Sequence, residues 1–151
     1  MVNSSLDRAQ IQELGASLRQ IDRKITTPEI SLGIARVWYQ GGEPYFDVSV
    51  NLRDGEVEWF QFTLRGRALS WNRQANPSKI TESPWQTGQT SELQTEGITL
   101  YPASTLVTSD RALNYDFLAV AYNILATRPD DPILRKITDI CHCLLNQETE
   151  N

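Results

Sequence analysis

The sequence predicts an α+β fold with an N-terminal helix, a four-stranded antiparallel β-meander and two C-terminal helices packed on one sheet face. Three observations predict this class. Apolar and polar side chains alternate from residue 45 to residue 71, as in half-buried strands. Asp54-Gly55 and Gly66 interrupt that alternation where hairpin turns would stand. Apolar residues on either side of this region recur every three or four positions, as on amphipathic helices.

The N-terminal helix is expected over residues 6–25, with Ser5 as its N-cap and Pro28 beyond its end. Its apolar residues recur at alternating intervals of three and four, which places them on one stripe. That stripe is predicted to pack on the sheet of the same chain. It comprises Ile11, Leu14, Leu18, Ile21 and Ile25.

The first two strands are predicted over residues 29–39 and 45–52. In the following hairpin, we require the large apolar side chains to share a face, because a slip of one residue would move them to the other side. A three-residue loop over 53–55 with a G1 bulge satisfies this and pairs Val48 with Phe60. The helices should then cover a face made of Phe46, Val48, Val50, Phe60, Phe62 and Leu64.

The second hairpin is predicted to turn at Gly66-Arg67, in a type II′ turn that pairs Leu64 with Leu69. The fourth strand then ends near Asn72. Residues 73–97 are polar and lack a clear period, so they are interpreted as a long loop. Residues 98–101 suggest a short fifth strand that Pro102 ends.

Two helices are predicted in the last third of the chain. The first begins after Ser109 or Asp110, reaches about Thr127 and is apolar on most of its sides. The second has Asp131 as its cap and Pro132 at its first position, where a missing N–H costs little. Residues 148–151 are expected to form a frayed tail, and the whole chain (1–151) a single domain.

Composition excludes several classes of protein. The net charge of −5 opposes binding to duplex nucleic acid. The longest apolar run, 117–126, is well short of the roughly 20 residues that cross a bilayer, so no membrane span is expected. The first residues lack the basic start and apolar stretch of a secretory signal. We therefore expect a cytoplasmic location.

Most catalytic signatures are missing, since there is no Gly-rich phosphate loop, G-x-S-x-G elbow or H-E-x-x-H motif. Cys141, His142 and Cys143 lie in a predicted helix, where positions two apart point in different directions. They cannot all bind one tetrahedral metal ion. Cys141 is expected to be a small core residue and His142 to lie at the surface. We therefore expect no catalytic residue, no metal and no cofactor.

The leading hypothesis is a non-catalytic protein-interaction, regulatory or adaptor protein. Its partner would be another protein or a second copy of this chain, in a homodimer. The contact would use the apolar helix or the second face of the sheet, where aromatic residues and arginine resemble the composition of interface hot spots. The residues expected on that surface are Tyr39, Tyr45, Trp59, Gln61 and Arg65.

Two alternatives remain open. The first is a small-molecule-binding or hydrolytic protein, with a pocket between sheet and helices under the 73–97 loop. Its candidate residues are Asp47, Trp85 and Asp116, and it requires a cavity lined by at least two ionisable groups that include one of the two aspartates. The second alternative is single-stranded nucleic-acid binding, in which bases would stack on the aromatic sheet face beside the arginines.

Overall fold

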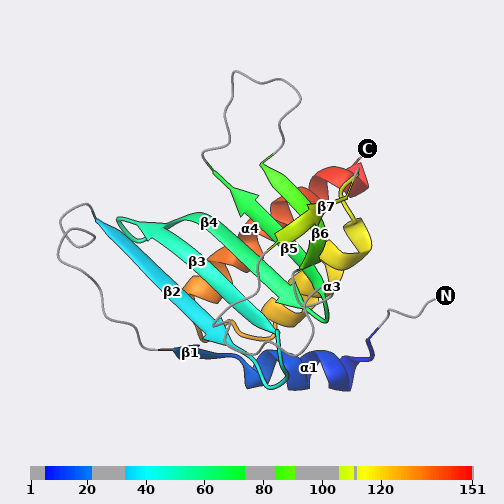
Figure 1. Cartoon of the computed structure of the whole chain (residues 1–151), viewed down its shortest axis with the longest axis horizontal. Coiled ribbons are helices and arrows are strands. Elements are labelled where there is room, and N and C mark those ends of the chain that lie inside the picture. Colours follow the sequence, from blue (N-terminus) through cyan, green and yellow to red (C-terminus); the bar gives the residue numbers. More distant parts are fainter. Residues whose placement is uncertain (1–5, 22–32, 74–83, 91–105, 111, 151) are drawn as a thin grey trace.

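The computed structural model describes residues 6–21, 33–73, 84–90, 106–110 and 112–150 (Figure 1). These ranges contain three helices and one seven-stranded antiparallel sheet, which confirms the α+β class but corrects the predicted four strands. The helices are α1 (Arg8–Ser17), α3 (Tyr115–Leu125) and α4 (Pro132–Glu150). The strands are β1 (Arg19–Ile21), β2 (Ile34–Gln40), β3 (Asp47–Arg53), β4 (Glu56–Leu64), β5 (Arg67–Asn72), β6 (Trp85–Thr90) and β7 (Leu106–Ser109).

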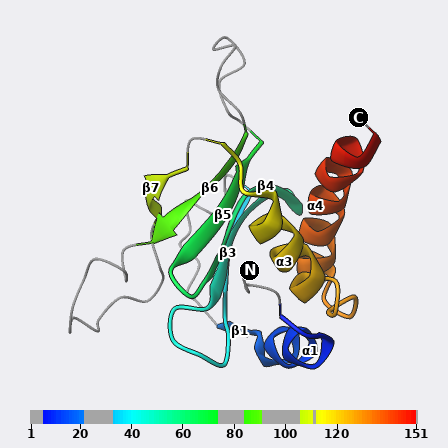
Figure 2. The same ribbon diagram turned by 90° about the vertical axis from the view of Figure 1, so that its right-hand side faces the viewer.

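The strands follow each other in sequence order, from β1 at one edge to β7 at the other. Figure 2 shows α3 and α4 packed on one face of this sheet, with α1 beside α3 at one end. The core lies between the sheet and these helices. Its largest fully buried side chains are Tyr39, Phe46, Val48, Val50, Phe60, Phe62, Leu69, Leu118, Ile124, Leu125, Leu134 and Ile137.

The hairpin between β3 and β4 turns through Asp54 and Gly55 alone, not through the predicted three-residue loop over 53–55. Both residues have positive φ, 51° and 86°, as a type I′ turn requires. The register then shifts within β4, where one extra residue forms a bulge. This bulge places Phe60 opposite Val50 rather than the predicted Val48. The large apolar side chains still share one face, because the bulge restores the alternation that the shorter turn would otherwise invert.

The hairpin between β4 and β5 turns one residue earlier than predicted. Arg65 and Gly66 occupy the turn with φ of 52° and 85°, which is again type I′ rather than type II′. Leu69 therefore lies opposite Phe62 and not opposite Leu64. Arg65 thus lies at the tip of this hairpin. Its left-handed conformation is uncommon for a residue with a Cβ.

Strand β2 has its faces exchanged relative to the sequence prediction. Tyr39 pairs with Val48 and is fully buried on the helix-covered face, whereas it was expected on the second face. Trp38 points to the second face instead. The exchange is stable because the hydroxyl of Tyr39 finds a partner at the start of α4, where it donates to Asp131 at 2.8 and 2.9 Å.

Strand β6 lies within the region predicted to be a loop. Its sequence, Trp-Gln-Thr-Gly-Gln-Thr, has only one large apolar residue, so no alternation marks it as a strand. That residue, Trp85, joins Phe60 and Trp71 in an aromatic cluster with ring centroids 6.0 to 6.4 Å apart. The rest of the predicted loop, 74–83 and 91–97, and the predicted strand over 98–101 lie outside the described residues.

Helix α1 begins later and ends earlier than predicted. Its N-cap is Asp7 rather than Ser5, because Asp7 and Gln10 form a reciprocal capping box. After Leu18 the chain enters β1, where the prediction continued the helix. Arg128 donates to the carbonyl oxygens of Gly15 and Leu18, at 3.1 and 2.7 Å, and so satisfies the end of the helix.

The C-terminal helices are close to the prediction. Helix α3 is capped by Asn114 and not by Ser109 or Asp110, since the chain through residue 109 belongs to β7. Asp131 caps α4 as predicted, by accepting from two amides of its first turn. The backbone of α4 is helical to Glu150, and the expected fraying of residues 148–151 stays a prediction. Asn151 lies outside the described residues.

The bond between Tyr39 and Asp131 gives a testable stability effect. Burial raises the pKa of Tyr39 above its ordinary value, and the hydrogen bond to Asp131 adds a smaller rise. The hydroxyl therefore stays protonated and donates. We expect Tyr39→Phe to lower the free energy of unfolding by about 1.5–3 kcal/mol, as for hydrogen bonds to charged groups. Urea denaturation measures this loss. Tyr115→Phe, at an exposed position, is the matched control, and an equal loss in both variants would contradict the assignment.

Candidate functional site

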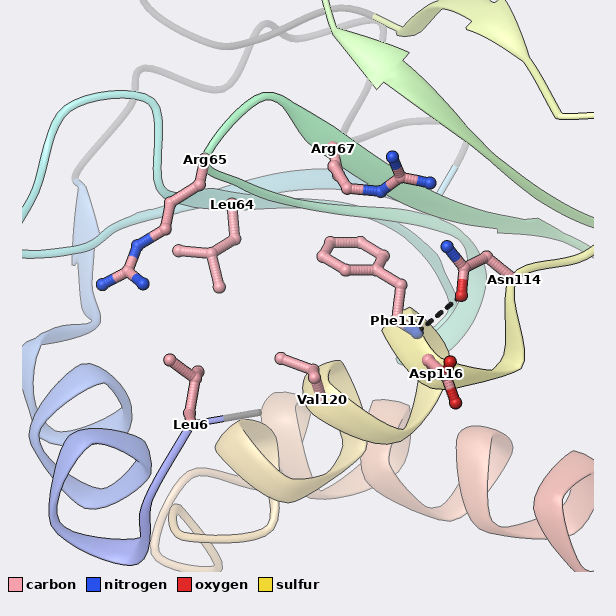
Figure 3. A pocket seen from close by; sticks show the side chains of 8 residues that line it. All are labelled: Leu6, Leu64, Arg65, Arg67, Asn114, Asp116, Phe117 and Val120. Atoms are coloured by element: carbon pink, nitrogen blue, oxygen red, sulfur yellow. Dashed lines mark hydrogen bonds between the residues drawn. The ribbon is translucent and has the colours of Figure 1, made fainter. Parts of the chain in front are cut away.

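A pocket of about 330 Å³ opens between the sheet and the first turns of α3 (Figure 3). Three segments far apart in the sequence meet there: the β4–β5 turn, the residue before the cap of α1, and the start of α3. The residues that line it are Leu6, Leu64, Arg65, Arg67, Asn114, Asp116, Phe117 and Val120.

The walls of the pocket are apolar. Leu64 comes from the end of β4, and Leu6 and Val120 lie across the pocket from it (Figure 3). Leu64 and Phe117 are only 4% and 8% exposed, so the core holds both in place. A chain of carbon atoms could therefore be buried here without displacing a polar group.

One side of the pocket ends at Arg65, which is held by a carboxylate. Its Nε and Nη2 donate to the two carboxylate oxygens of Glu43 at 2.9 and 3.1 Å, in a bidentate pair. The hydrogen bond to Glu43 raises the pKa of Arg65. The guanidinium points away from Arg67, towards α1 (Figure 3). Arg65 is thus already engaged with its own chain.

The other side ends at Arg67, which is held more loosely. Its Nη2 lies 3.4 Å from a carboxylate oxygen of Asp110, which is long for a charged hydrogen bond. The same oxygen accepts from the hydroxyl of Thr87 at 2.8 Å. Thr87 in turn accepts from the backbone amide of Asn114 at 2.9 Å. This polar chain links β5, β6 and the start of α3, and fixes the Arg67 side of the pocket.

The first turn of α3 completes the polar rim. Oδ1 of Asn114 accepts from the amide of Phe117 at 3.0 Å, which caps the helix. Its Nδ2 is therefore the free end of the amide, and Figure 3 shows it turned towards Arg67. Asp116 is exposed in the same turn, where a negative charge suits the helix dipole.

The five residues expected on a binding surface do not share one. Tyr39 is buried on the helix-covered face. Trp59 and Gln61 lie on the second face, where Trp59 is half-buried and Gln61 is 8% exposed. Tyr45 is half-buried in the loop before β3, with φ of 60°. Only Arg65 of the five lines the pocket.

Of the three residues expected around a pocket, only Asp116 lines this one. Asp47 is buried on the second face and accepts from the hydroxyl of Thr63 at 2.8 Å. Trp85 packs in the aromatic cluster of β4, β5 and β6. The apolar wall and Asn114 were missed, because nothing local in the sequence shows that the second hairpin meets the start of α3.

The Cys-His-Cys segment is placed as expected from helical geometry. Cys141 is fully buried, and burial raises the pKa of its thiol to about 12. Cys143 is exposed, and His142 is exposed and stacks on Tyr122 with ring centroids 5.8 Å apart. Within the described ranges, no three side chains of the metal-binding types gather at one point.

The comparisons with known proteins add no relative. No protein-family model, curated protein or solved structure matches this chain. In the part of the chain that the structure describes, none of the helices combines the length and the apolar character that crossing a membrane requires. Function is therefore inferred from the residues of the pocket itself.

Proposed function

We propose that this chain is a non-catalytic binding protein that holds a small amphiphilic molecule in the pocket between β4 and α3. The observation that carries the proposal is the combination of an apolar wall with a charged rim. Four apolar side chains face each other, and ionisable groups stand only around them. The pocket volume of about 330 Å³ lies at the lower end of the range for small-molecule sites, so the ligand should be small.

Binding fits this pocket better than hydrolysis. The described residues that line it include one carboxylate, Asp116, and no histidine, cysteine, serine or lysine. A general base needs a nucleophile or a bound water within hydrogen-bond reach, and a second group to stabilise developing charge. Two arginines could supply the latter, but Arg65 is directed out of the pocket. The arrangement supports retention of a ligand rather than a reaction.

Partner binding and single-stranded nucleic-acid binding stay predictions from the sequence. The apolar character of α3 has an internal explanation, since this helix packs between the sheet, α1 and α4. Among the described residues, Tyr115 is the large apolar side chain that is exposed, at 37%. These observations favour the pocket over an apolar docking face.

Calorimetric titration with straight-chain alcohols tests the proposal. Each methylene that enters an apolar pocket contributes about 0.8 kcal/mol, which is about fourfold in affinity. We therefore expect affinity to rise by about fourfold per carbon from 1-hexanol to 1-octanol. Absence of binding, or an affinity that does not change with chain length, would refute an apolar pocket.

A pair of variants on α3 places the binding site. Val120→Phe should fill the pocket and weaken 1-octanol binding by at least about tenfold. Asn123→Phe adds a larger side chain one turn later on the same helix, at an exposed position outside the pocket, and should leave the affinity unchanged. Equal effects of both variants would place the alcohol elsewhere.

A further inference from the structure

The charged groups at the two sides of the pocket are not equivalent. Arg65 donates two hydrogen bonds to Glu43 in a bidentate pair, and its guanidinium is directed away from the apolar wall. Arg67 makes a single long contact of 3.4 Å with Asp110, and its side chain is 38% exposed. A planar guanidinium carries five N–H donors, so Arg67 has donors left for a ligand. Figure 3 shows its guanidinium extending towards Asn114 at the rim of the pocket.

Other donors surround Arg67. Nδ2 of Asn114 is turned towards it, because Oδ1 is occupied by the cap of α3. The first turn of α3 adds the positive end of a helix dipole. An anionic group placed between Arg67 and Asn114 would receive charged hydrogen bonds from one and amide hydrogen bonds from the other.

From this asymmetry we infer that the ligand of the pocket is a carboxylate with a short aliphatic chain, whose head group binds Arg67 and Asn114 while its chain lies between Leu64 and Val120. The inference rests on the proposed function and specifies the ligand class. Two aspartates limit the affinity of this site. Asp110 competes for Arg67, and Asp116 places a negative charge on the same rim. Removing the charge of Asp110 should therefore strengthen binding.

Three ligands of equal chain length test the head group: octanoate, 1-octanol and octylammonium, titrated calorimetrically at low ionic strength. We expect octanoate to bind about tenfold more tightly than 1-octanol, and octylammonium more weakly than both. Equal affinities for octanoate and 1-octanol would overturn the inference and leave the apolar pocket standing. If none of the three binds, the proposed function fails as well.

Charge variants identify the arginine. Arg67→Gln should lower octanoate affinity about tenfold and so remove the preference for octanoate over 1-octanol. A circular dichroism spectrum like that of the wild-type protein shows that the variant is folded. Asp110→Asn should act in the opposite direction and raise octanoate affinity about threefold. Arg135→Gln, at an exposed position of α4, lowers the net charge by the same amount as Arg67→Gln and should leave the preference for octanoate unchanged. Loss of the preference in Arg65→Gln but not in Arg67→Gln would overturn the assignment.

Discussion

Phe62→Ala is expected to cause the largest loss of stability of any single substitution considered. Phe62 is fully buried at the centre of the sheet, and its ring contacts those of Phe46 and Phe117 with centroids 5.9 and 5.8 Å apart. Truncation removes the buried ring and leaves a cavity that the flanking strands cannot close. We expect the free energy of unfolding to fall by about 3–5 kcal/mol. Urea denaturation followed by tryptophan fluorescence measures this change.

Tyr115→Ala is the matched control, since it also removes an aromatic ring but from a position that is 37% exposed. Surface substitutions usually change stability by no more than about 0.5 kcal/mol. A loss at Phe62 no greater than that at Tyr115 would mean that the sheet does not turn this face inward.

Because Phe117 also lines the pocket, Phe62→Ala should in addition weaken ligand binding by loosening that wall.

Gly15→Ala is expected to destabilise the protein, although alanine is the better helix former by about 1 kcal/mol. A Cβ at this position would lie 1.9 Å from Oγ1 of Thr127 and 2.8 Å from the carbonyl oxygen of Ile124. Relief requires α1 to move away from the end of α3. Overpacking of this kind costs about 1–3 kcal/mol, so the overlap outweighs the propensity. Thermal unfolding measures the net effect.

The double variant Gly15→Ala with Thr127→Ala separates the two contacts. It removes the side-chain overlap but keeps the backbone overlap with Ile124, so only part of the lost stability should return. The hydroxyl of Thr127 also donates to the carbonyl oxygen of Ile124 at 2.7 Å, and that bond is lost in the double variant. If the single variant Gly15→Ala had a higher midpoint of thermal unfolding than the wild-type protein, α1 and α3 would not be in close contact.

The sequence predicted which side chains form the core more reliably than how the strands are joined. The alternation of large apolar residues in β3 and β4 depends only on local pattern, and both strands bury the expected face. The turn at Asp54 and the bulge in β4 compensate for each other, so a wrong turn length gave the correct face. No residue type marks that bulge, and its position follows from pairing across the sheet.

Long-range contacts account for the other differences. Tyr39 is buried because a carboxylate 92 residues later accepts its hydroxyl, which strand periodicity cannot show. Strand β6 is polar and forms because β5 offers an edge for it to pair with. The pocket could be predicted only in part. Asp116 was predicted from its place in an apolar helix, but the wall opposite depends on how the β4–β5 turn meets Leu6 and α3.

Contacts between protein methyl groups and a bound ligand test the central claim most directly. In a sample with labelled methyl groups, intermolecular nuclear Overhauser effects from the chain of 1-octanol should reach Leu6, Leu64 and Val120, which line the pocket. They should be absent from Ile140 and Leu144 on α4, which lie outside it. Effects confined to α4, or none at saturating 1-octanol, would contradict a ligand site between β4 and α3.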